Sequence, residues 1–254
     1  MGTKSHWQPR IPIDQSIYEL SSTQKAELGT RLVLGDTVHY YTKFGGATAL
    51  VRGHVVAAPI TTTHADNIAV LVGAIGGTTI TATYGATVLA ANYFAEGTVT
   101  VGTGTGIGQH LRIRSNLATS ASGTATIYLY DALPLALSTT SVITLRKNPY
   151  DSVEITAAAA AGVPVGVTNV TLATATEAGY FGWLQTWGPG PGLAAAAGIT
   201  VDTPVRCATT AGGVEVLIEA GTTGDTAIYR KILGWARCTT TSAGVGIVDW
   251  RIRC

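Results

Sequence analysis

Side chains that could bind a metal ion or catalyse a reaction are few in this chain and lie far apart. Charged residues make up 12% of its 254 positions. The best candidate for a metal-ligand pair is His64 with Asp66, which would share one face of a strand. A structural metal site usually needs about four ligands, and no third one is suggested. We therefore interpret the pair as polar residues at a strand end, and we expect no metal and no other cofactor. The remaining histidines are scattered, at His6, His39, His54 and His110.

A second candidate site is the glycine-rich segment Gly102–Gly108, whose spacing is similar to that of a phosphate-binding loop. The fingerprint would require a third glycine where the chain has Gln109, and no helical pattern follows. In such loops the N-terminus of the helix holds the phosphate. The segment is therefore predicted to be a hairpin tip between strands at Thr98–Val101 and Leu111–Arg114. Neither a Gly-x-Ser-x-Gly elbow nor a catalytic Cys–His signature is found, so we expect that the protein is not an enzyme.

Aromatic residues form the third candidate site. Six of them gather in the last third of the chain, at Tyr180, Phe181, Trp183, Trp187, Trp235 and Trp250. The first four precede a Gly-Pro-Gly-Pro-Gly segment, Gly188–Gly192, which is predicted to be a turn. Two interpretations stay open: the rings fill an ordinary β-sheet core, or some of them form an aromatic platform that stacks against sugars. A platform needs exposed rings with a polar rim.

The elements that would position these groups are β-strands. Thr alternates with Val, Ile or Tyr along several short runs, because β-branched side chains fit a pleated surface. The sequence therefore predicts an all-β fold, an antiparallel sandwich or barrel built of short strands with an extended N-terminal arm. Hairpins are expected to join Thr78–Tyr84 with Thr87–Tyr93 and Thr124–Tyr130 with Ser141–Leu145. One helical turn is expected at Ser22–Gly29.

Charge and hydropathy argue against two kinds of partner. The net charge is +1 and no basic run occurs, so we expect no nucleic-acid binding. Mean hydropathy is +0.29, and the charge-free stretch from Asn67 to Ala95 is long enough to span a bilayer. Glycines interrupt this stretch and Thr78–Tyr84 has strand character, so neither a transmembrane helix nor a membrane partner is expected.

Three cysteines, Cys207, Cys238 and Cys254, show no metal-binding spacing. Together with a start that has no signal-peptide pattern, they suit a chain that folds in a reducing cytosol with free thiols. A Cys207–Cys238 bridge is the alternative if the two strands are neighbours.

The first twenty residues are predicted to be an extended arm. Two prolines disfavour regular structure, yet the segment carries five large apolar side chains, Trp7, Ile11, Ile13, Ile17 and Tyr18. A segment without a periodic face cannot bury such side chains by itself. We therefore expect these five residues to dock on a capsid or on a neighbouring subunit.

The chain is predicted to divide softly near residue 150, where the composition changes. The expected parts are an arm with a short helical turn (1–27), a β-domain (28–150), and a second β-domain or a continuation of the same sandwich (151–254).

Short motifs along most of the chain resemble head structural proteins of tailed bacteriophages. They include Leu28–Arg31, Gly35-Asp36, Val38–Tyr41, Gly46-Ala47, Leu50–Gly53, Glu96-Gly97, His110–Asn116, Tyr128–Leu133, Lys147–Tyr150, Gly162–Gly166, Gly182–Gly188 and Leu233–Ala236. The resemblance implies a capsid decoration or cement protein that binds the outside of the head and stabilises the shell. Its partner would be the major capsid protein, and its location the virion, assembled in the host cytoplasm. It also favours a homotrimer, because decoration proteins often occupy local three-fold positions.

Two alternatives to a decoration protein stay open. One is a carbohydrate-binding or host-attachment protein of a fibre or tail, which the aromatic cluster would suit. The other is a major capsid subunit, although the near absence of long amphipathic helices speaks against it. An oligomer is also expected because uncharged strands such as Ile80–Tyr84 would expose apolar surface in a monomer.

Overall fold

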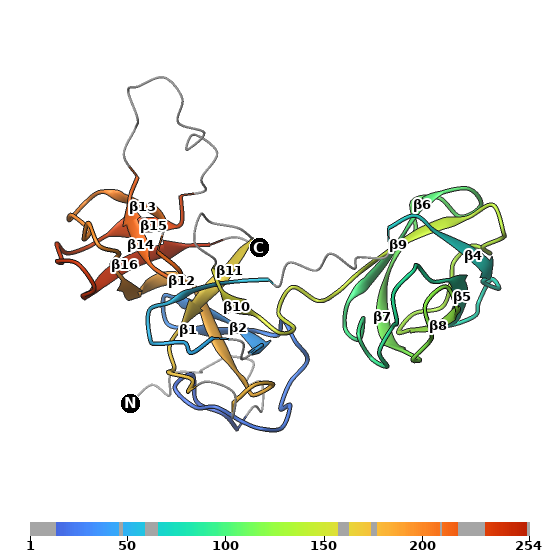
Figure 1. The fold of residues 1–254 in the computed structure, drawn as a ribbon, viewed down its shortest axis with the longest axis horizontal. Helices are drawn as coiled ribbons and strands as arrows, with labels where there is room; N and C mark the ends of the chain where they lie inside the picture. Colours follow the sequence, from blue (N-terminus) through green and yellow to red (C-terminus); the bar gives the residue numbers. More distant parts are fainter. Residues whose placement is uncertain are drawn as a thin grey trace, which may run out of the picture. The chain divides into compact units, whose positions relative to one another are not determined.

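The predicted all-β class is confirmed by the computed structural model. The structure describes residues 14–45, 48–58, 66–156, 163–173, 177–208, 210–217 and 232–252. Sixteen strands and no helix occur in these ranges. No helix of membrane-spanning length and hydrophobicity is therefore present in the described part of the chain. The strands fall into two compact units, residues 1–59 with 150–254 and residues 60–149 (Figure 1).

This division corrects the predicted domain boundaries. The expected domain 28–150 is not one unit, since residues 28–59 belong with the C-terminal part and 60–149 form a unit of their own. The composition changes near residue 150 because the chain returns there to a sheet that it had left at residue 59. The boundary near residue 59, where the chain leaves the large sheet, could not be predicted from the sequence. Strands that pair across an inserted unit have the same local pattern as strands that pair with their neighbours.

The unit of residues 60–149 is a closed six-stranded antiparallel barrel with the order β4-β5-β8-β7-β6-β9, and β9 pairs with β4 to close it. Its strands are β4 (Ile68–Val72), β5 (Thr79–Thr83), β6 (Thr98–Thr103), β7 (His110–Asn116), β8 (Thr124–Leu129) and β9 (Val142–Arg146). The ring of labelled strands is visible in Figure 1. Closure leaves no strand edge that could pair with another chain.

Alternation of threonine with aliphatic residues builds the barrel wall. In β5, Ile80 and Ala82 are fully buried in the barrel core, whereas the threonines between them face outward. Successive side chains of a strand point to opposite faces, so one run supplies both core and surface. The prediction that Ile80–Tyr84 exposes apolar surface is therefore wrong, since Ile80, Ala82 and Tyr84 all point into the core.

Only one of the three predicted hairpins in this region is present. The glycine-rich segment does join β6 and β7, where Thr98 pairs with Arg112. Residues 87–93 form no strand, and β5 pairs instead with β4 and β8. Strand β9 pairs with β6 and β4, not with β8. Alternation identifies a strand and its inner face, but the partner is chosen by closure of the barrel.

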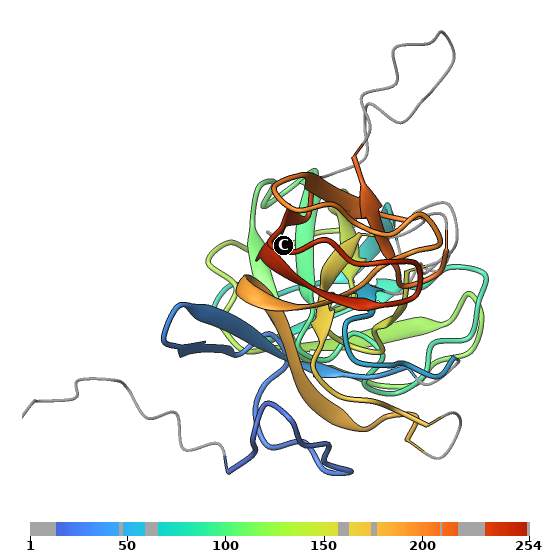
Figure 2. The same cartoon turned by 90° about the vertical axis from the view of Figure 1, so that its left-hand side faces the viewer.

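The other unit is a ten-stranded antiparallel sheet with the order β10-β3-β11-β12-β16-β15-β13-β14, to which β2 and β1 add through β12. The strands are β1 (Arg31–Leu34), β2 (Thr37–Lys43), β3 (Val55–Ala57), β10 (Glu154–Ile155), β11 (Pro164–Thr168), β12 (Phe181–Leu193), β13 (Pro204–Cys207), β14 (Val214–Val216), β15 (Gly234–Ala236) and β16 (Val245–Arg251). Strand β12 is the centre of this sheet. Its first half pairs with β2 and its second half with β16, as the orange, blue and red strands of Figure 2 show.

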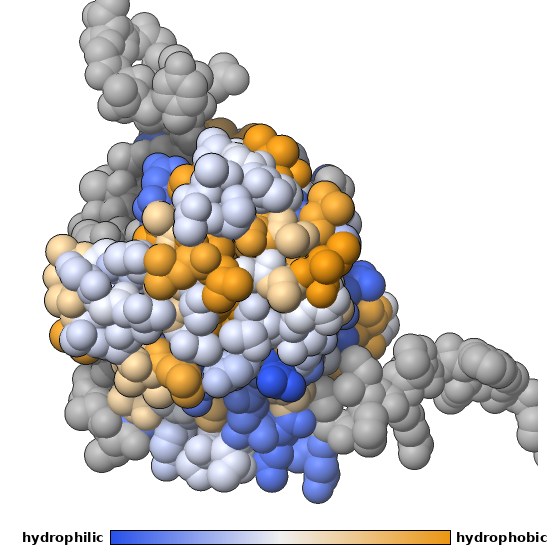
Figure 3. Space-filling view, turned by 90° about the vertical axis from the view of Figure 1, so that its right-hand side faces the viewer, coloured by the Kyte–Doolittle hydropathy of each residue, from blue (hydrophilic) through white to orange (hydrophobic). Residues whose placement is uncertain are grey.

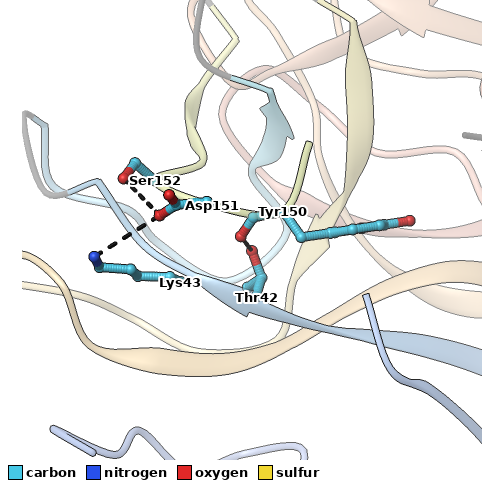
Figure 4. A network of polar contacts seen from close by, with 5 residues as sticks. All are labelled: Thr42, Lys43, Tyr150, Asp151 and Ser152. Atoms are coloured by element: carbon cyan, nitrogen blue, oxygen red, sulfur yellow. Dashed lines mark hydrogen bonds and ion pairs between the residues drawn. The ribbon is translucent and has the colours of Figure 1, made fainter. Parts of the chain in front are cut away.

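A polar network fixes the point where the chain returns from the barrel. The Thr42 hydroxyl donates to the Tyr150 carbonyl at 2.8 Å. The Ser152 hydroxyl donates to Asp151 Oδ1 at 2.9 Å, and the Lys43 ammonium lies 3.8 Å from the same oxygen (Figure 4). Residues 150–152 are thereby held beside the end of β2.

The described part of the N-terminal segment docks on its own chain. Gln15 is buried: its Oε1 accepts from the Tyr41 hydroxyl at 3.0 Å, and its carbonyl accepts from Trp183 Nε1 at 3.3 Å. The helical turn predicted at Ser22–Gly29 is absent, because tertiary contacts take the backbone donors that a helix would use. The amide of Lys25 donates to the Tyr41 hydroxyl.

Candidate functional site on the outward face of β12, β16 and β15

The Gly-Pro-Gly-Pro-Gly segment is part of strand β12, so the predicted turn is wrong. Gly188, Gly190 and Gly192 pair with Trp250, Val248 and Gly246 of β16. The three glycines point inward, whereas the two prolines point outward. A Cβ atom on Gly192 would lie 2.7 Å from Val248 and 3.1 Å from Trp250, so only glycine fits there. The strand thus presents proline on one face and leaves room for the core on the other.

A buried glutamine holds β12 at its change of partner. The ladder with β2 shifts register between Gln185 and Trp187, which is a β-bulge. The amide Nε2 of Gln185 lies 3.2, 3.1 and 2.9 Å from the carbonyls of Trp187, Gly188 and Pro189. The bulge and this amide together orient the side chains of Trp187 and Pro189.

The fold separates the four described tryptophans into two classes. Trp183 and Trp250 are completely buried, which is the ordinary core interpretation. Trp187 is 39% exposed and Trp235 is half-buried, and both lie on the outward face. The guanidinium carbon of Arg251 lies 5.6 Å from the centre of the Trp187 ring and 4.7 Å from that of Trp235. The cation is thus attracted to both rings and orders them.

Apolar side chains continue this surface along β16 and β12. Ile247 is 52% exposed and faces Pro191 across the ladder, and Val245 is 57% exposed. Beside them Arg237 Nη2 donates to Asp249 Oδ2 at 2.8 Å. We name the surface the Trp–Pro face and define it by Trp187, Pro189, Pro191, Trp235, Val245, Ile247 and Arg251.

The chemistry available to the Trp–Pro face is contact and stacking. Rings, prolines and β-branched residues on paired strands form a rigid apolar surface, and Arg251 and the Arg237–Asp249 pair add directional polar groups. Within the ranges that the structure describes, no group of three His, Cys, Asp or Glu side chains could hold a metal ion. What the face offers a partner is a flat apolar surface with two aromatic rings, the Arg251 guanidinium and the Arg237–Asp249 ion pair.

The structure describes two of the five predicted docking residues, Ile17 and Tyr18. Trp7, Ile11 and Ile13 lie outside the described residues. Ile17 is half-buried, and Tyr18 is 62% exposed beside the segment that docks on its own sheet. Neither Ile17 nor Tyr18 belongs to the Trp–Pro face, and docking of Trp7, Ile11 and Ile13 stays a prediction.

The three described histidines, His39, His54 and His110, lie in different segments of the fold. His64 lies outside the described residues, so its pairing with Asp66 stays a prediction. His39 and His54 are buried, and burial lowers the pKa of both, that of His39 to about 4. His39 Nε2 lies 3.0 Å from the Thr37 hydroxyl. His110 is on the barrel, 2.8 Å from the Thr100 hydroxyl.

The cysteines are not bridged to each other. Cys207 is buried in β13, and Cys238 accepts a hydrogen bond from the Ile247 amide at 3.1 Å. The alternative of a Cys207–Cys238 bridge is therefore not present in the described part of the chain, and Cys254 lies outside it.

One signal in the sequence does point to the Trp–Pro face. Small and large residues alternate from Trp187 to Leu193 with period two, as in a strand, and prolines occupy every second position. The usual association of Gly and Pro with turns hides this pattern.

Comparisons of the chain with models of protein families, with curated proteins and with solved structures returned no match.

Proposed function

We propose that this protein is a structural component of a tailed-bacteriophage virion that decorates the outer surface of the head and stabilises the shell. The phage assignment rests on the short motifs that resemble head proteins. The observation that carries a binding role is the Trp–Pro face, where Trp187, Ile247 and Val245 are each 39–57% exposed on strands that cannot move independently. Exposed apolar patches of this kind mark protein interfaces.

The architecture of the face suits attachment to a repetitive shell. Its side chains are fixed by β-ladders, by the buried amide of Gln185 and by Arg251, so little conformational entropy is lost on binding. The face includes Trp and Arg, which are the residue types that most often dominate binding energy in protein interfaces. Many copies on one particle would add modest contacts into a stable shell.

The test measures binding of the purified chain to heads assembled without it, with bound copies counted after sedimentation. Trp187→Ala and Ile247→Asp should each weaken binding by about tenfold or more. Val33→Asp is the matched control, because Val33 is 41% exposed on β1 of the same unit but lies outside the Trp–Pro face. Equal binding by all four proteins, or no binding by any, would refute this attachment.

A second candidate function is carbohydrate binding for host attachment, and the pair of accessible tryptophans favours it. Trp187 and Trp235 flank Arg251, and the Arg237–Asp249 pair supplies a polar rim. Rings with such a rim can stack on sugars and hydrogen-bond their hydroxyls. A glycan array separates the two functions: binding that Trp235→Ala removes would support the carbohydrate function, and an array without signal would leave capsid attachment as the better proposal.

A further inference from the structure

Three arginines are the only Lys, Arg, Asp or Glu residues on the six described strands of the barrel. Arg112 and Arg114 lie on β7, and Arg146 lies on β9. All three are exposed, because they alternate with residues such as Ile113 that point into the core. Strongly hydrophilic residues are drawn blue in Figure 3, and most of the coloured surface there is pale or orange. A group of like charges is therefore a distinct feature of this chain.

The strand register places Arg112 and Arg146 on one side of the barrel wall. Arg112 pairs with Thr98 of β6, and Thr98 pairs in turn with Arg146 of β9. Two strand spacings separate the arginines, which is about 10 Å. Tyr130 extends the same row, because its amide donates to the Arg112 carbonyl at 3.1 Å. The sequence shows no basic run here because the members of the row lie far apart in the chain.

Tyrosine rings order two of the arginines. The guanidinium carbon of Arg112 lies 4.8 Å from the centre of the Tyr130 ring, and that of Arg114 lies 5.8 Å from the centre of the Tyr128 ring. Such cation–π contacts restrict the side chains before a partner arrives. An ordered guanidinium presents its N–H donors as a fork that matches a carboxylate, sulfate or phosphate group. We name this surface the Arg–Tyr face and define it by Thr98, Arg112, Arg114, Tyr128, Tyr130 and Arg146.

The strands of the barrel supply no acidic residue to neutralise the Arg–Tyr face. The acidic residues that the structure describes in this unit are Asp66, Glu96 and Asp131, and all three lie in connections. Arg114 and Arg146 form no ion pair with any described residue. Exposed cations without such partners attract an anionic ligand, so charge complementarity defines the sign of the partner.

We infer that the Arg–Tyr face binds an acidic polysaccharide. Proteins that bind single-stranded nucleic acid stack its bases on open aromatic rings, whereas the arginines already lie over the rings of Tyr128 and Tyr130. Hydroxyl groups surround the cations instead: Thr98, Thr100 and Thr144 are half-buried beside them on β6 and β9. The arginines would pair with the acidic groups of the polymer, and the threonines would hydrogen-bond its sugar hydroxyls. This inference does not rest on the proposed phage function, and it concerns a surface distinct from the Trp–Pro face.

The test is isothermal titration calorimetry of the full chain with polygalacturonate, whose sugars carry carboxylates, and with uncharged dextran. The wild type should bind polygalacturonate and not dextran, and Arg112→Ala and Arg146→Ala should each raise the dissociation constant about tenfold. Arg31→Ala is the matched control, because Arg31 is exposed on β1 of the other unit and its loss changes the net charge equally. Far-ultraviolet circular dichroism checks that every variant is folded.

A wild type that does not bind polygalacturonate would overturn the inference, and so would equal weakening by Arg31→Ala. Oligothymidylate provides a further arm: tighter binding of this oligomer that depends on Arg112 and Arg146 would assign the face to nucleic acid and refute the polysaccharide. Trp235→Ala should leave polygalacturonate binding unchanged, and its loss in this variant would place the ligand on the Trp–Pro face instead. Binding to heads is measured separately, so failure of the proposed function leaves this result standing.

Discussion

Replacing Gly192 by alanine should destabilise the large sheet by overpacking its core. The new Cβ would lie 2.7 Å from Val248 Cγ2 and 3.1 Å from Trp250 Cζ2, whereas carbon atoms in contact prefer about 3.5–4.0 Å. Val248 and Trp250 are completely buried, so neither can turn toward solvent. Overpacking of this kind destabilises the fold by about 1–3 kcal/mol. Alanine also lowers the conformational entropy of the unfolded chain, which stabilises the fold by about 0.4–1 kcal/mol. The free energy of unfolding should fall by about 1–2 kcal/mol.

Tryptophan fluorescence reports on the altered unit alone. All five tryptophans lie outside residues 60–149, so urea unfolding followed by their emission does not detect the barrel. With a urea slope of about 1–3 kcal/mol per molar, the midpoint should fall by roughly 0.5–1 M. The matched control is Gly213→Ala in the same unit, where the nearest atoms would lie at an ordinary 3.5 Å. Its midpoint should stay the same or rise. Equal midpoints for Gly192→Ala and the wild type would refute the packing argument.

Three further outcomes can be checked independently. Burial lowers the pKa of His39 from 6.5 to about 4, so the unfolded chain binds a proton that the folded chain does not. Stability of the large sheet should therefore fall as the pH drops from about 6.5 to about 4, by up to roughly 3 kcal/mol, and His39→Gln should lose this component when urea midpoints are compared across that pH range. Ile127→Ala should destabilise the barrel by about 2–5 kcal/mol, because Ile127 is fully buried in its core; hydrogen exchange of the barrel amides should rise while the tryptophan-detected transition stays unchanged. Cys238, which is half-buried, should react with a thiol reagent before the buried Cys207, as peptide mapping by mass spectrometry will show.

Local patterns in the sequence are sufficient for the class of fold and for several elements. Threonine alternating with aliphatic residues identifies the strands and their inner faces, since the period of two is a property of the extended backbone itself. Adjacent strands with a short turn are also predictable, and the hairpin of β1 with β2 and that of β6 with β7 are present. These features depend on residues that are close in the chain.

The pairing of distant strands could not be predicted, because a strand with one apolar face carries no mark of its partner. Strand β5 pairs with β8 across an intervening hairpin, and residues 28–59 pair with strands that follow the barrel. The same limit applies to the candidate site. Trp183 and Trp187 are the same residue type in the same strand, yet Trp183 is completely buried and Trp187 is 39% exposed.

The sequence by itself determined that this chain forms β-strands, through the alternation of threonine with aliphatic residues, and that few of its residues are charged. The tertiary structure decided that Gly188–Gly192 continues a strand, because glycine there makes room for Val248 and Trp250. It also decided which tryptophans face Arg251 and which loops meet at one end of the barrel. Both outcomes depend on contacts between segments far apart in sequence, where packing against a specific neighbour overrides the local preference of glycine and proline for turns.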